Sequence, residues 1–197
     1  MVTLEQHISR QKLNARTGGD SSTPIGLFQE IVGRIPQEMK KDPNRKFLDP
    51  AAGTGTSIIV LFHELKKYHS EEHILNNMLY VCEVNRFKLR ILKNLGIKNI
   101  YEGSFLKQDF KDMKFDVITG NPPYNDSEGM KSKKNGANAG KADFYKQFII
   151  KLQSNLKPEG ILAFIVPPGA FRTFYAEGFE LYLQYFNHIK TFGKSIA

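Results

Sequence analysis

The stretch KFLDPAAGTG at residues 46–55 joins a short apolar segment to a turn that contains two glycines. Apolar side chains then recur at helical spacing at Ile58, Leu61, Phe62 and Leu65. A strand that passes through glycines into a helix can turn tightly and lets a ligand approach the backbone. No Gly-Lys-Ser/Thr follows, as a P-loop would need, and Ile58 stands where a dinucleotide fingerprint has its third glycine. The turn therefore predicts a ligand site without naming the ligand.

Strand-like and helix-like segments alternate along most of the chain. Apolar runs predict strands at residues 46–48, 78–82, 98–101, 115–119, 160–166 and 189–192. Helical periodicity predicts helices over residues 24–35, after residue 55, and near residues 87–95, 143–156 and 179–186. This alternation is typical of a Rossmann-like, doubly wound and mostly parallel sheet. We expect residues 23–197 to form that domain, truncated at its C-terminal strands, and residues 1–22 to form a polar N-terminal arm.

Two of the helices carry more detailed expectations. Thr23 is expected to cap the first helix, with Pro24 at its first helical position. The helix near residues 87–95 is expected to end at Gly96. We expect its apolar face to bury Phe87, Ile91, Leu92 and Leu95.

Polar residues follow the predicted strands directly. Asp49 follows the first strand, Glu83 the second and Asn121 the fourth. Because the carboxyl ends of parallel strands share one edge of a sheet, we expect these residues to meet in one crevice. An acidic residue at the position of Glu83 commonly accepts both hydroxyls of a ribose. A surface glutamate that caps the next helix would occupy the same position, so both interpretations stay open.

The motif Asn121-Pro122-Pro123-Tyr124 ends the apolar run at residues 115–120. Prolines fix φ and carry no N–H, so this turn is stiff and its carbonyl groups have few donors nearby. It presents an amide oxygen, a fixed backbone carbonyl and a flat aromatic ring. Such a group can hold a planar molecule that bears an NH2. The alternative is an ordinary strand-to-loop turn with a stacked tyrosine.

Composition permits nucleic acid as a partner. The chain of 197 residues has a formal net charge of +8 and is 41% hydrophobic, which suits a globular domain. A basic balance permits attraction to nucleic acid or to an anionic membrane. The single cysteine, Cys82, lies in an apolar run and is expected to be a buried thiol. No membrane-spanning or signal segment is evident, so we expect a cytoplasmic protein.

A polar segment at residues 125–142 is rich in lysine, glycine, asparagine and serine. A loop of this length is either functional or a solvated surface segment. The five histidines are scattered without the spacing of metal ligands, so no metal site is expected.

These motifs, taken in order, resemble those of amino-group methyltransferases that use S-adenosylmethionine. They are most similar to DNA adenine-N6 methyltransferases of restriction-modification systems, in which the glycine motif precedes the catalytic one. The resemblance covers about residues 20–192. It depends on Thr23-Pro24, DPAAGTG at residues 49–55, Glu83, Phe105, the motif at residues 121–124, the helix from Asp143 and GILAFIVP at residues 160–167.

The resemblance implies S-adenosylmethionine as cofactor and assigns roles by position. Thr23, Asp49 and the backbone of Ala51, Gly53 and Gly55 would hold its amino-acid part. Glu83 would bind the ribose, and Phe105 would flank the adenine of the cofactor. Ser104 stands where the family usually has an aspartate for that adenine's amine.

The resemblance also implies how the substrate is held. A flipped adenine from double-stranded DNA would present its amine to the side-chain oxygen of Asn121 and the carbonyl of Pro122. Asn121 would thus face both cofactor and substrate. Tyr124 would stack on the base, and the other substrate contacts would come from Pro123, Lys131, Lys133 and Lys134.

Two features leave alternatives open. Similar motifs occur in RNA and protein-glutamine methyltransferases, and Ser104 together with the short C-terminus would also fit a non-catalytic module of the same fold. The chain has no evident region that would read the DNA sequence. We therefore expect that a missing domain or a partner chain supplies target recognition, or that the chain is a small enzyme with loose specificity.

Overall fold

The computed structural model describes residue 6, residues 23–122, residues 147–148 and residues 150–165. The chain divides into two compact units, residues 1–124 with 155–165, and residues 125–154 with 166–197. In the described part of the second unit, residues 147–148 and 150–154 are helical. The predictions for the N-terminal arm, the loop at residues 125–142, the helix near residues 179–186 and the strand at residues 189–192 lie outside the described residues.

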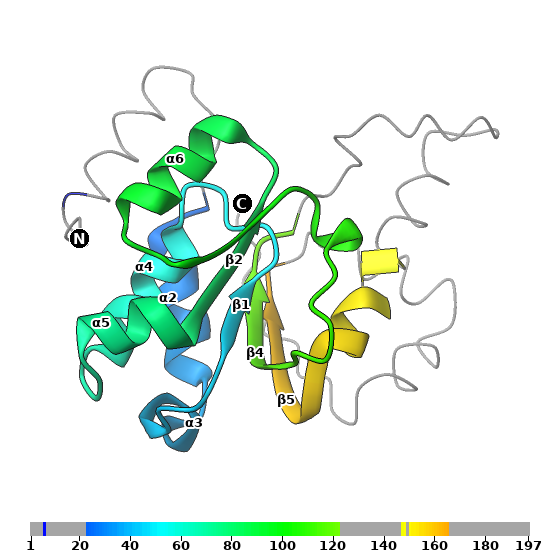
Figure 1. Cartoon of the computed structure of the whole chain (residues 1–197). Coiled ribbons are helices and arrows are strands. Elements are labelled where there is room, and N and C mark those ends of the chain that lie inside the picture. Colours follow the sequence, from blue (N-terminus) through cyan, green and yellow to red (C-terminus); the bar gives the residue numbers. More distant parts are fainter. Residues whose placement is uncertain (1–5, 7–22, 123–146, 149, 166–197) are drawn as a thin grey trace, which may run out of the picture. The chain divides into compact units, whose positions relative to one another are not determined.

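Five parallel strands form the sheet of the first unit, in the order β3-β2-β1-β4-β5 (Figure 1). The strands are β1 (Phe47–Asp49), β2 (Leu79–Glu83), β3 (Asn99–Glu102), β4 (Phe115–Gly120) and β5 (Leu156–Phe164). The predicted parallel sheet is therefore confirmed, and the first four strands start within one residue of their predicted positions.

Two helices of the first unit precede β1, and the others lie between the strands in sequence. They are α2 (Ile25–Arg34), α3 (Gln37–Lys41), α4 (Thr56–Leu65), α5 (Glu71–His73) and α6 (Arg86–Asn94). A π-helical turn, η1 (Ile74–Met78), leads into β2, and a 3-10 turn, η2 (Phe105–Lys107), follows β3.

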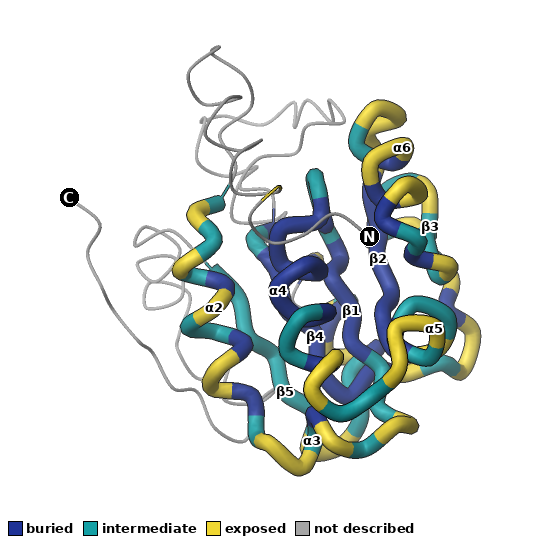
Figure 2. The backbone as a smooth tube through the Cα atoms, turned by 90° about the vertical axis from the view of Figure 1, so that its left-hand side faces the viewer, coloured by how far each residue is buried: buried dark blue, intermediate teal, exposed yellow. Residues whose placement is uncertain are grey.

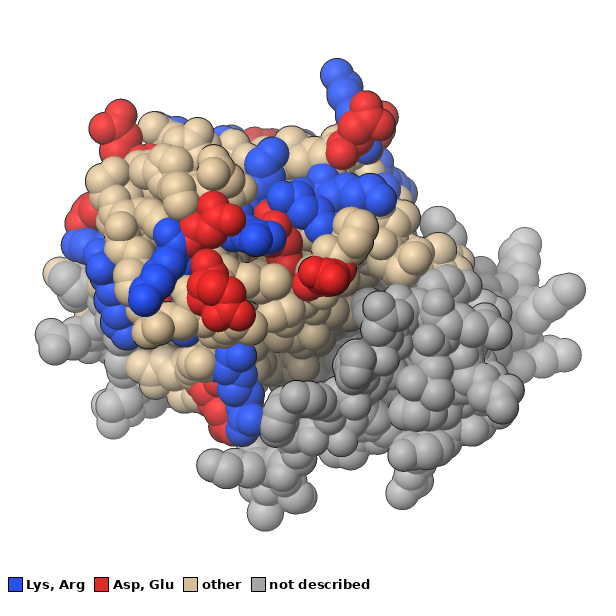
Figure 3. All heavy atoms as spheres, turned by 90° about the horizontal axis from the view of Figure 1, so that it is seen from below, with Lys and Arg blue, Asp and Glu red and all other residues tan. Residues whose placement is uncertain are grey.

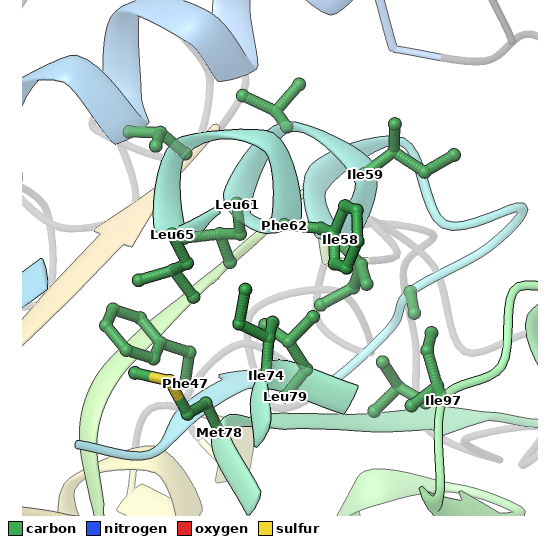
Figure 4. Packing of buried hydrophobic residues seen from close by; sticks show 14 of the residues in the cluster. Phe47, Ile58, Ile59, Leu61, Phe62, Leu65, Ile74, Met78, Leu79 and Ile97 are labelled. Carbon is green, nitrogen blue, oxygen red and sulfur yellow. The ribbon is translucent and has the colours of Figure 1, made fainter. Parts of the chain in front are cut away.

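Helix α4 lies at the centre of the main core. Apolar side chains on most of its circumference are buried, which is typical of a helix enclosed by protein on several sides (Figure 2). Its inward side chains pack on strands β1 and β2 and on η1 (Figure 4). The labelled members of this cluster are Phe47, Ile58, Ile59, Leu61, Phe62, Leu65, Ile74, Met78, Leu79 and Ile97. This packing holds the glycine turn, which precedes α4, against the end of β1.

An aromatic cluster forms a second core. Tyr101 and Phe110 have ring centroids 4.7 Å apart, and Phe110 and Phe115 have centroids 5.2 Å apart in an edge-to-face arrangement. Tyr80 packs edge-on against Phe115 at 5.4 Å, and Phe105 lies 5.9 Å from Phe110. These rings tie the segment after β3 to strands β2 and β4.

The prediction for the buried face of α6 is wrong at two positions. Phe87 is 76% exposed and Ile91 is 38% exposed, whereas Leu89 and Leu92 are buried. The helix has more apolar residues than one buried face can hold. Leu92 and Leu95 pack close to Gly55, so the face that carries them is the one turned toward the protein. Val84, Phe87 and Ile91 are thus exposed apolar side chains.

This exposure pattern predicts that two truncations on α6 lower the free energy of unfolding by very different amounts. Leu92→Ala leaves a cavity at a fully buried position, and we expect it to lower the free energy of unfolding by about 3 kcal/mol. Phe87→Ala removes a ring that already faces water and should change it by less than about 0.5 kcal/mol. Urea unfolding of both variants tests this. Equal losses would show that Phe87 is packed in the native protein.

The prediction for the start of β5 is also wrong. Leu156 was expected on the apolar face of a helix, but it starts the strand and pairs with Phe115. Val117 pairs with Ile161, so the strand carries several extra residues between these two pairs. Glu159 has a φ of 61° inside this irregularity. Pro158 and the turn-like residues around it hide the early part of the strand from a pattern search.

Basic and acidic side chains are interspersed on the face that Figure 3 shows. Among the described residues, charged side chains form ion pairs that include Arg34 with Glu30, Lys66 with Glu71, Lys67 with Glu64 and Lys93 with Glu102. On this face the described residues do not form a basic patch. The net charge of +8 is therefore not evidence for a nucleic-acid surface there.

A buried carboxylate lies at the amino end of β4. The Asp116 side chain accepts hydrogen bonds from Arg45 Nη1 at 2.7 Å and from Lys157 Nζ at 2.8 Å. The backbone N–H of Lys46 donates to it at 2.9 Å. Asp116 therefore joins the segment before β1 to the first residues of β5, on the edge of the sheet opposite Asn121.

Candidate active site at the carboxyl edge of the sheet

The strand order places a switch point between β1 and β4. From β1 the chain continues to β2 on one side, whereas β4 pairs with its other side. Leu48 is level with Ile118, so Asp49 and Gly120 end their strands beside each other. Ligands of open α/β sheets bind at such a position, beyond the carboxyl ends of the strands.

Asp49 is buried at this point, with 2% of its surface exposed. Its Oδ1 accepts a hydrogen bond from the backbone N–H of Ala51 at 2.9 Å, and its Oδ2 accepts one from the hydroxyl of Ser57. Burial raises the pKa of Asp49 to about 7; the hydrogen bonds from Ser57 and Ala51 oppose this shift, and the nearby charge of Glu83 adds to it. Ser57 was not singled out from the sequence, although a polar side chain that starts an apolar helix is a usable signal.

Gly120 links Asp49 to Asn121. A β-carbon at position 120 would stand 2.6 Å from Oδ1 of Asp49, so the carboxyl group occupies the space that a side chain would need. The end of β4 therefore packs directly on the residue that starts the glycine turn. Gly120 is a site residue that the sequence-based prediction missed, although its place directly before Asn121 was an available signal.

The two glycines of the turn both have left-handed backbone conformations, with φ of 58° at Gly53 and 88° at Gly55. A β-carbon on Gly55 would also stand 2.9 Å from Cδ1 of Leu95. No described atom lies within 4 Å of the place where a β-carbon of Gly53 would stand. Gly53 therefore leaves an open approach to the backbone, as the sequence predicted for this turn.

The backbone N–H groups of the turn donate to protein acceptors. Besides the bond from Ala51 to Asp49, Ala52 donates to the carbonyl of Cys82 at 3.0 Å and Gly55 to the carbonyl of Ala52 at 2.8 Å. The N–H of Gly53 donates to Oε2 of Glu83 at 2.7 Å. These bonds fix the shape of the turn.

Glu83 joins three segments. Its Oε1 accepts hydrogen bonds from the backbone N–H groups of Val84 at 2.9 Å and Asn85 at 2.7 Å. Its backbone carbonyl accepts one from the N–H of Gly103 at 2.8 Å. The side chain of Asn85, and not that of Glu83, caps α6. A carboxylate has about four acceptor positions. Three of those on Glu83 take backbone N–H groups of described residues, which leaves about one for a ligand hydroxyl.

Ser104 and Phe105 follow β3 at the same edge. Ser104 is half-buried and Phe105 is 2% exposed, with its ring in the aromatic cluster. The side chain of Asp109, the nearest following aspartate, accepts the N–H of Lys111 at 2.8 Å and so closes its own turn.

Thr23 does not cap α2, contrary to expectation. The helix starts at Ile25, Pro24 stands in the cap position, and no side chain makes a capping bond there. Instead, Oγ1 of Thr23 accepts a hydrogen bond from Nδ2 of Asn121 at 2.8 Å. Asn121 is half-buried and Pro122 is buried. The structure thus joins the first and last motifs of the predicted site.

Other predicted site residues lie outside the described residues, namely Pro123, Tyr124, Lys131, Lys133 and Lys134. Within the part of the chain that is described, no three His, Cys, Asp or Glu side chains are grouped as metal ligands. The described helices are too short or too polar to cross a membrane. Cys82 is buried, as predicted.

The raised pKa of Asp49 predicts how stability depends on pH. Between about pH 4 and pH 7 the folded protein keeps a proton on Asp49 that the unfolded chain releases, so stability falls as the pH rises through this range. Asp49→Asn is neutral at every pH and should remove this fall. Urea unfolding of both proteins at several pH values measures it, with exposed Asp112→Asn as control. Parallel pH profiles for Asp49→Asn and wild type would contradict the shift.

Comparison with known proteins relates this chain to restriction-modification methylases. The model of the family described as Eco57I restriction-modification methylase matches residues 37–195. Modification methylase CviBIII of Paramecium bursaria Chlorella virus NC1A is 28% identical over 179 residues. The aligned region is 83% of this chain and 41% of that relative, so the chain spans less than half of the relative's length.

Solved structures share the fold. The M protein of the type I restriction enzyme EcoKI superposes with a TM-score of 0.56 at 17% identity, over 84% of this chain and 45% of its own. A Listeria monocytogenes protein, described as a class I S-adenosylmethionine-dependent methyltransferase, superposes with a TM-score of 0.58 at 16% identity, over 79% and 50%. These likenesses show the methyltransferase fold.

Proposed function

Because the chain belongs to the Eco57I restriction-modification methylase family, we propose that it transfers a methyl group from S-adenosylmethionine to the N6 amine of adenine in DNA. The observation that carries this proposal is the contact between the two halves of the site. Asn121 directly follows Gly120, whose β-carbon would stand 2.6 Å from Asp49 at the start of the glycine turn. An amide that can hold an amine therefore lies beside a turn that can hold a cofactor.

The residues of the turn suit this cofactor. S-adenosylmethionine, when bound, supplies a methyl group on a positively charged sulfur. The open space at Gly53 admits a ligand to the backbone, and Glu83 presents its remaining acceptor position to a ribose hydroxyl. Asp49, Ala51 and Gly55 belong to this turn, and together with Thr23, which bonds to Asn121, they would hold the amino-acid part of the cofactor. Ser104 and Phe105 would lie toward the adenine of the cofactor, where a serine hydroxyl replaces the charge of an aspartate.

Asn121 and Pro122 would activate the amine. The lone pair of an adenine amine is delocalised into the ring, so the amine is a poor nucleophile. Two carbonyl acceptors draw its N–H bonds out of the ring plane and return electron density to the nitrogen. Positive charge then develops on that nitrogen as the methyl group transfers, and the same oxygens stabilise it. The rest of the catalysis is alignment of the reacting atoms, at an approach of about 3 to 3.5 Å.

The substrate would enter as an extruded base. Flipping an adenine out of the duplex costs a few kcal/mol. Stacking on Tyr124 would return roughly 1 to 3 kcal/mol. Pro123 would line the base, and Lys131, Lys133 and Lys134 would contact phosphates. These residues all belong to one segment that directly follows the strand end.

Sequence recognition would come from outside the described residues. The aligned part of the CviBIII methylase is 41% of its length, so that relative has further regions. We propose that this chain likewise depends on a further domain or a partner chain to choose its target. A DNA substrate agrees with the cytoplasmic location expected from the sequence.

A labelled-methyl assay tests the proposal. The protein is incubated with S-adenosylmethionine that carries a radioactive methyl group and with unmethylated DNA, tRNA or a glutamine-containing peptide. Label on adenine N6 of DNA is the expected result. Label on tRNA or peptide alone would reveal one of the other two enzyme classes. If calorimetry detects no cofactor binding at millimolar concentration, the chain is a non-catalytic module.

A further inference from the structure

We infer that Asp49 distinguishes the cofactor from its product by charge, because its buried carboxyl group releases a proton when S-adenosylmethionine binds and keeps it when the demethylated product binds. The inference rests on the proposed function. It adds a role to a residue that the resemblance assigned only to holding the amino-acid part of the cofactor. It starts from the surroundings of two acidic side chains at the glycine turn.

These two acidic side chains are buried without a positively charged partner. Asp49 is 2% exposed and Glu83 is 7% exposed. The hydrogen bonds of their carboxyl groups come from neutral donors, which are backbone N–H groups and the hydroxyl of Ser57. Neither forms an ion pair with another of the described residues. A buried charge is ordinarily paired with an opposite one, so this part of the protein lacks a positive charge.

The carboxyl group of Asp49 is already enclosed by the protein before a ligand binds. Oδ1 accepts the N–H of Ala51 and fills the space beside Gly120, and Oδ2 bonds to Ser57. A ligand can therefore remove little more water from this carboxyl group. Burial and a nearby charge are two of the causes that shift the pKa of a carboxyl group. Because burial is complete in advance, the charge of the ligand decides what binding does to Asp49.

Without a ligand, Asp49 is about half protonated near neutral pH. Burial raises its pKa to about 7, and the charge of Glu83 acts in the same direction. Asp49 packs against β2 and β4 in the sheet and against the start of α4. Besides Glu83, the titratable side chains on these elements are Tyr80 and Cys82 on β2, Asp116 on β4, and His63 and Glu64 on α4. Among all of these, Glu83 is the one whose charge shifts the pKa of Asp49.

The cofactor and its product differ by one positive charge. S-adenosylmethionine has a sulfonium, an ammonium and a carboxylate group, so its net charge is positive. S-adenosylhomocysteine, the product, lacks the charge on sulfur and is neutral overall. A positive charge that binds about 4 to 6 Å from a carboxyl group lowers the pKa of that group by about 1 to 3. The cofactor therefore ionises Asp49 when it enters at Gly53, whereas the product leaves the proton in place.

Calorimetry in two buffers of different ionisation enthalpy counts the protons released on binding. Near pH 7 we expect wild type to release about 0.4 to 0.5 proton more than Asp49→Asn with S-adenosylmethionine, and less than about 0.2 more with S-adenosylhomocysteine. Asparagine has the same shape and no proton to lose, so the difference removes any contribution of the ligand. Exposed Asp112→Asn should match wild type. Equal release with both ligands, or none with the cofactor, overturns the inference.

Ser57→Ala gives a second test that keeps the carboxyl group. The hydroxyl of Ser57 lowers the pKa of Asp49, so its removal should raise that pKa further. In wild type, the Kd of S-adenosylmethionine should fall about 5-fold from pH 6 to pH 7.5 and then level off. In Ser57→Ala the fall should continue to higher pH. The Kd of S-adenosylhomocysteine should change by less than about 2-fold over the same range. A Ser57→Ala profile that coincides with wild type contradicts the inference.

Carbon-13 nuclear magnetic resonance follows the proton without an assay of activity. The carboxyl signal of Asp49 is assigned by its loss in Asp49→Asn. At pH 7 it should move to its ionised position with saturating S-adenosylmethionine and stay in place with S-adenosylhomocysteine. An unmoved signal with bound cofactor overturns the inference and leaves the proposed function standing. If wild type labels none of the three substrates, the proposed function fails, and the same spectra still show whether the cofactor ionises Asp49.

Discussion

Asn121→Ala is expected to abolish methyl transfer and to leave the fold intact. The substitution removes the oxygen that would accept the target amine, and a single preorganised group of this kind is worth about 10²- to 10³-fold in kcat. Asn121 follows the last residue of β4, is half-buried and is not a member of the main hydrophobic core, so we expect the core to keep its packing without it.

Three measurements on Asn121→Ala separate chemistry from folding. Transfer of labelled methyl should fall below detection or nearly so, while thermal unfolding stays close to wild type. The cofactor Kd, measured by calorimetry, shows how much of the loss arises from weaker cofactor binding. Asn94→Ala is a matched control, because it makes the same chemical change on the exposed end of α6. Activity that survives in Asn121→Ala would mean that the amide does not hold the reacting nitrogen.

The second large effect is expected at the opposite edge of the sheet, where Asp116→Ala should lower the free energy of unfolding by about 3 kcal/mol at neutral pH. The loss arises because Arg45 Nη1, Lys157 Nζ and the backbone N–H of Lys46 each lose the oxygen to which they donate. It lies at the lower end for a buried ion pair, since the side chains of Arg45 and Lys157 are 37% and 38% exposed and can turn to water.

The contribution of Asp116 should also depend on pH. Burial acts to raise the pKa of Asp116, but hydrogen bonds from Lys157, Lys46 and Arg45 prevail and lower it below its usual 3.8. The unfolded chain therefore takes up a proton first as the pH falls, and the stabilisation is lost below about pH 4. Urea unfolding should show a gap between Asp116→Ala and wild type that narrows in acid. Exposed Asp112→Ala should show no such gap, and a gap of constant size would contradict the prediction.

The overall architecture followed from the sequence because it depends on repeated local signals. Apolar runs marked the strands, and the glycines at residues 53 and 55 marked the turn that opens α4. Parallel pairing then brought Asp49, Glu83 and Asn121 to one edge, as expected. Each of these inferences used many residues or a strict backbone requirement, such as the positive φ of Gly53 and Gly55.

The wrong predictions arose where a contact between residues distant in sequence replaced the one that the local sequence pattern indicated. Thr23 had the right chemistry for a cap, but Asn121, distant in sequence, uses its hydroxyl instead. Phe87 had the right spacing for the core, but α6 packs with Leu92 close to Gly55, and this orientation leaves Phe87 facing water. The roles of Ser57 and Gly120 depend on the position of the Asp49 carboxyl in three dimensions, which the sequence alone does not give.

The hydrogen bonds within the glycine turn have a consequence for ligand charge. A nucleotide-binding loop gives its amide protons to phosphate oxygens. Here the backbone N–H groups of Ala51, Ala52, Gly53 and Gly55 all donate hydrogen bonds to acceptors of the protein itself. Two of those acceptors are the acidic side chains of Asp49 and Glu83. The carboxylate of Glu83 would thus repel a polyphosphate, which would gain little from these four amides in return. A ligand with hydroxyls and a cationic group could bind at the same position without this repulsion.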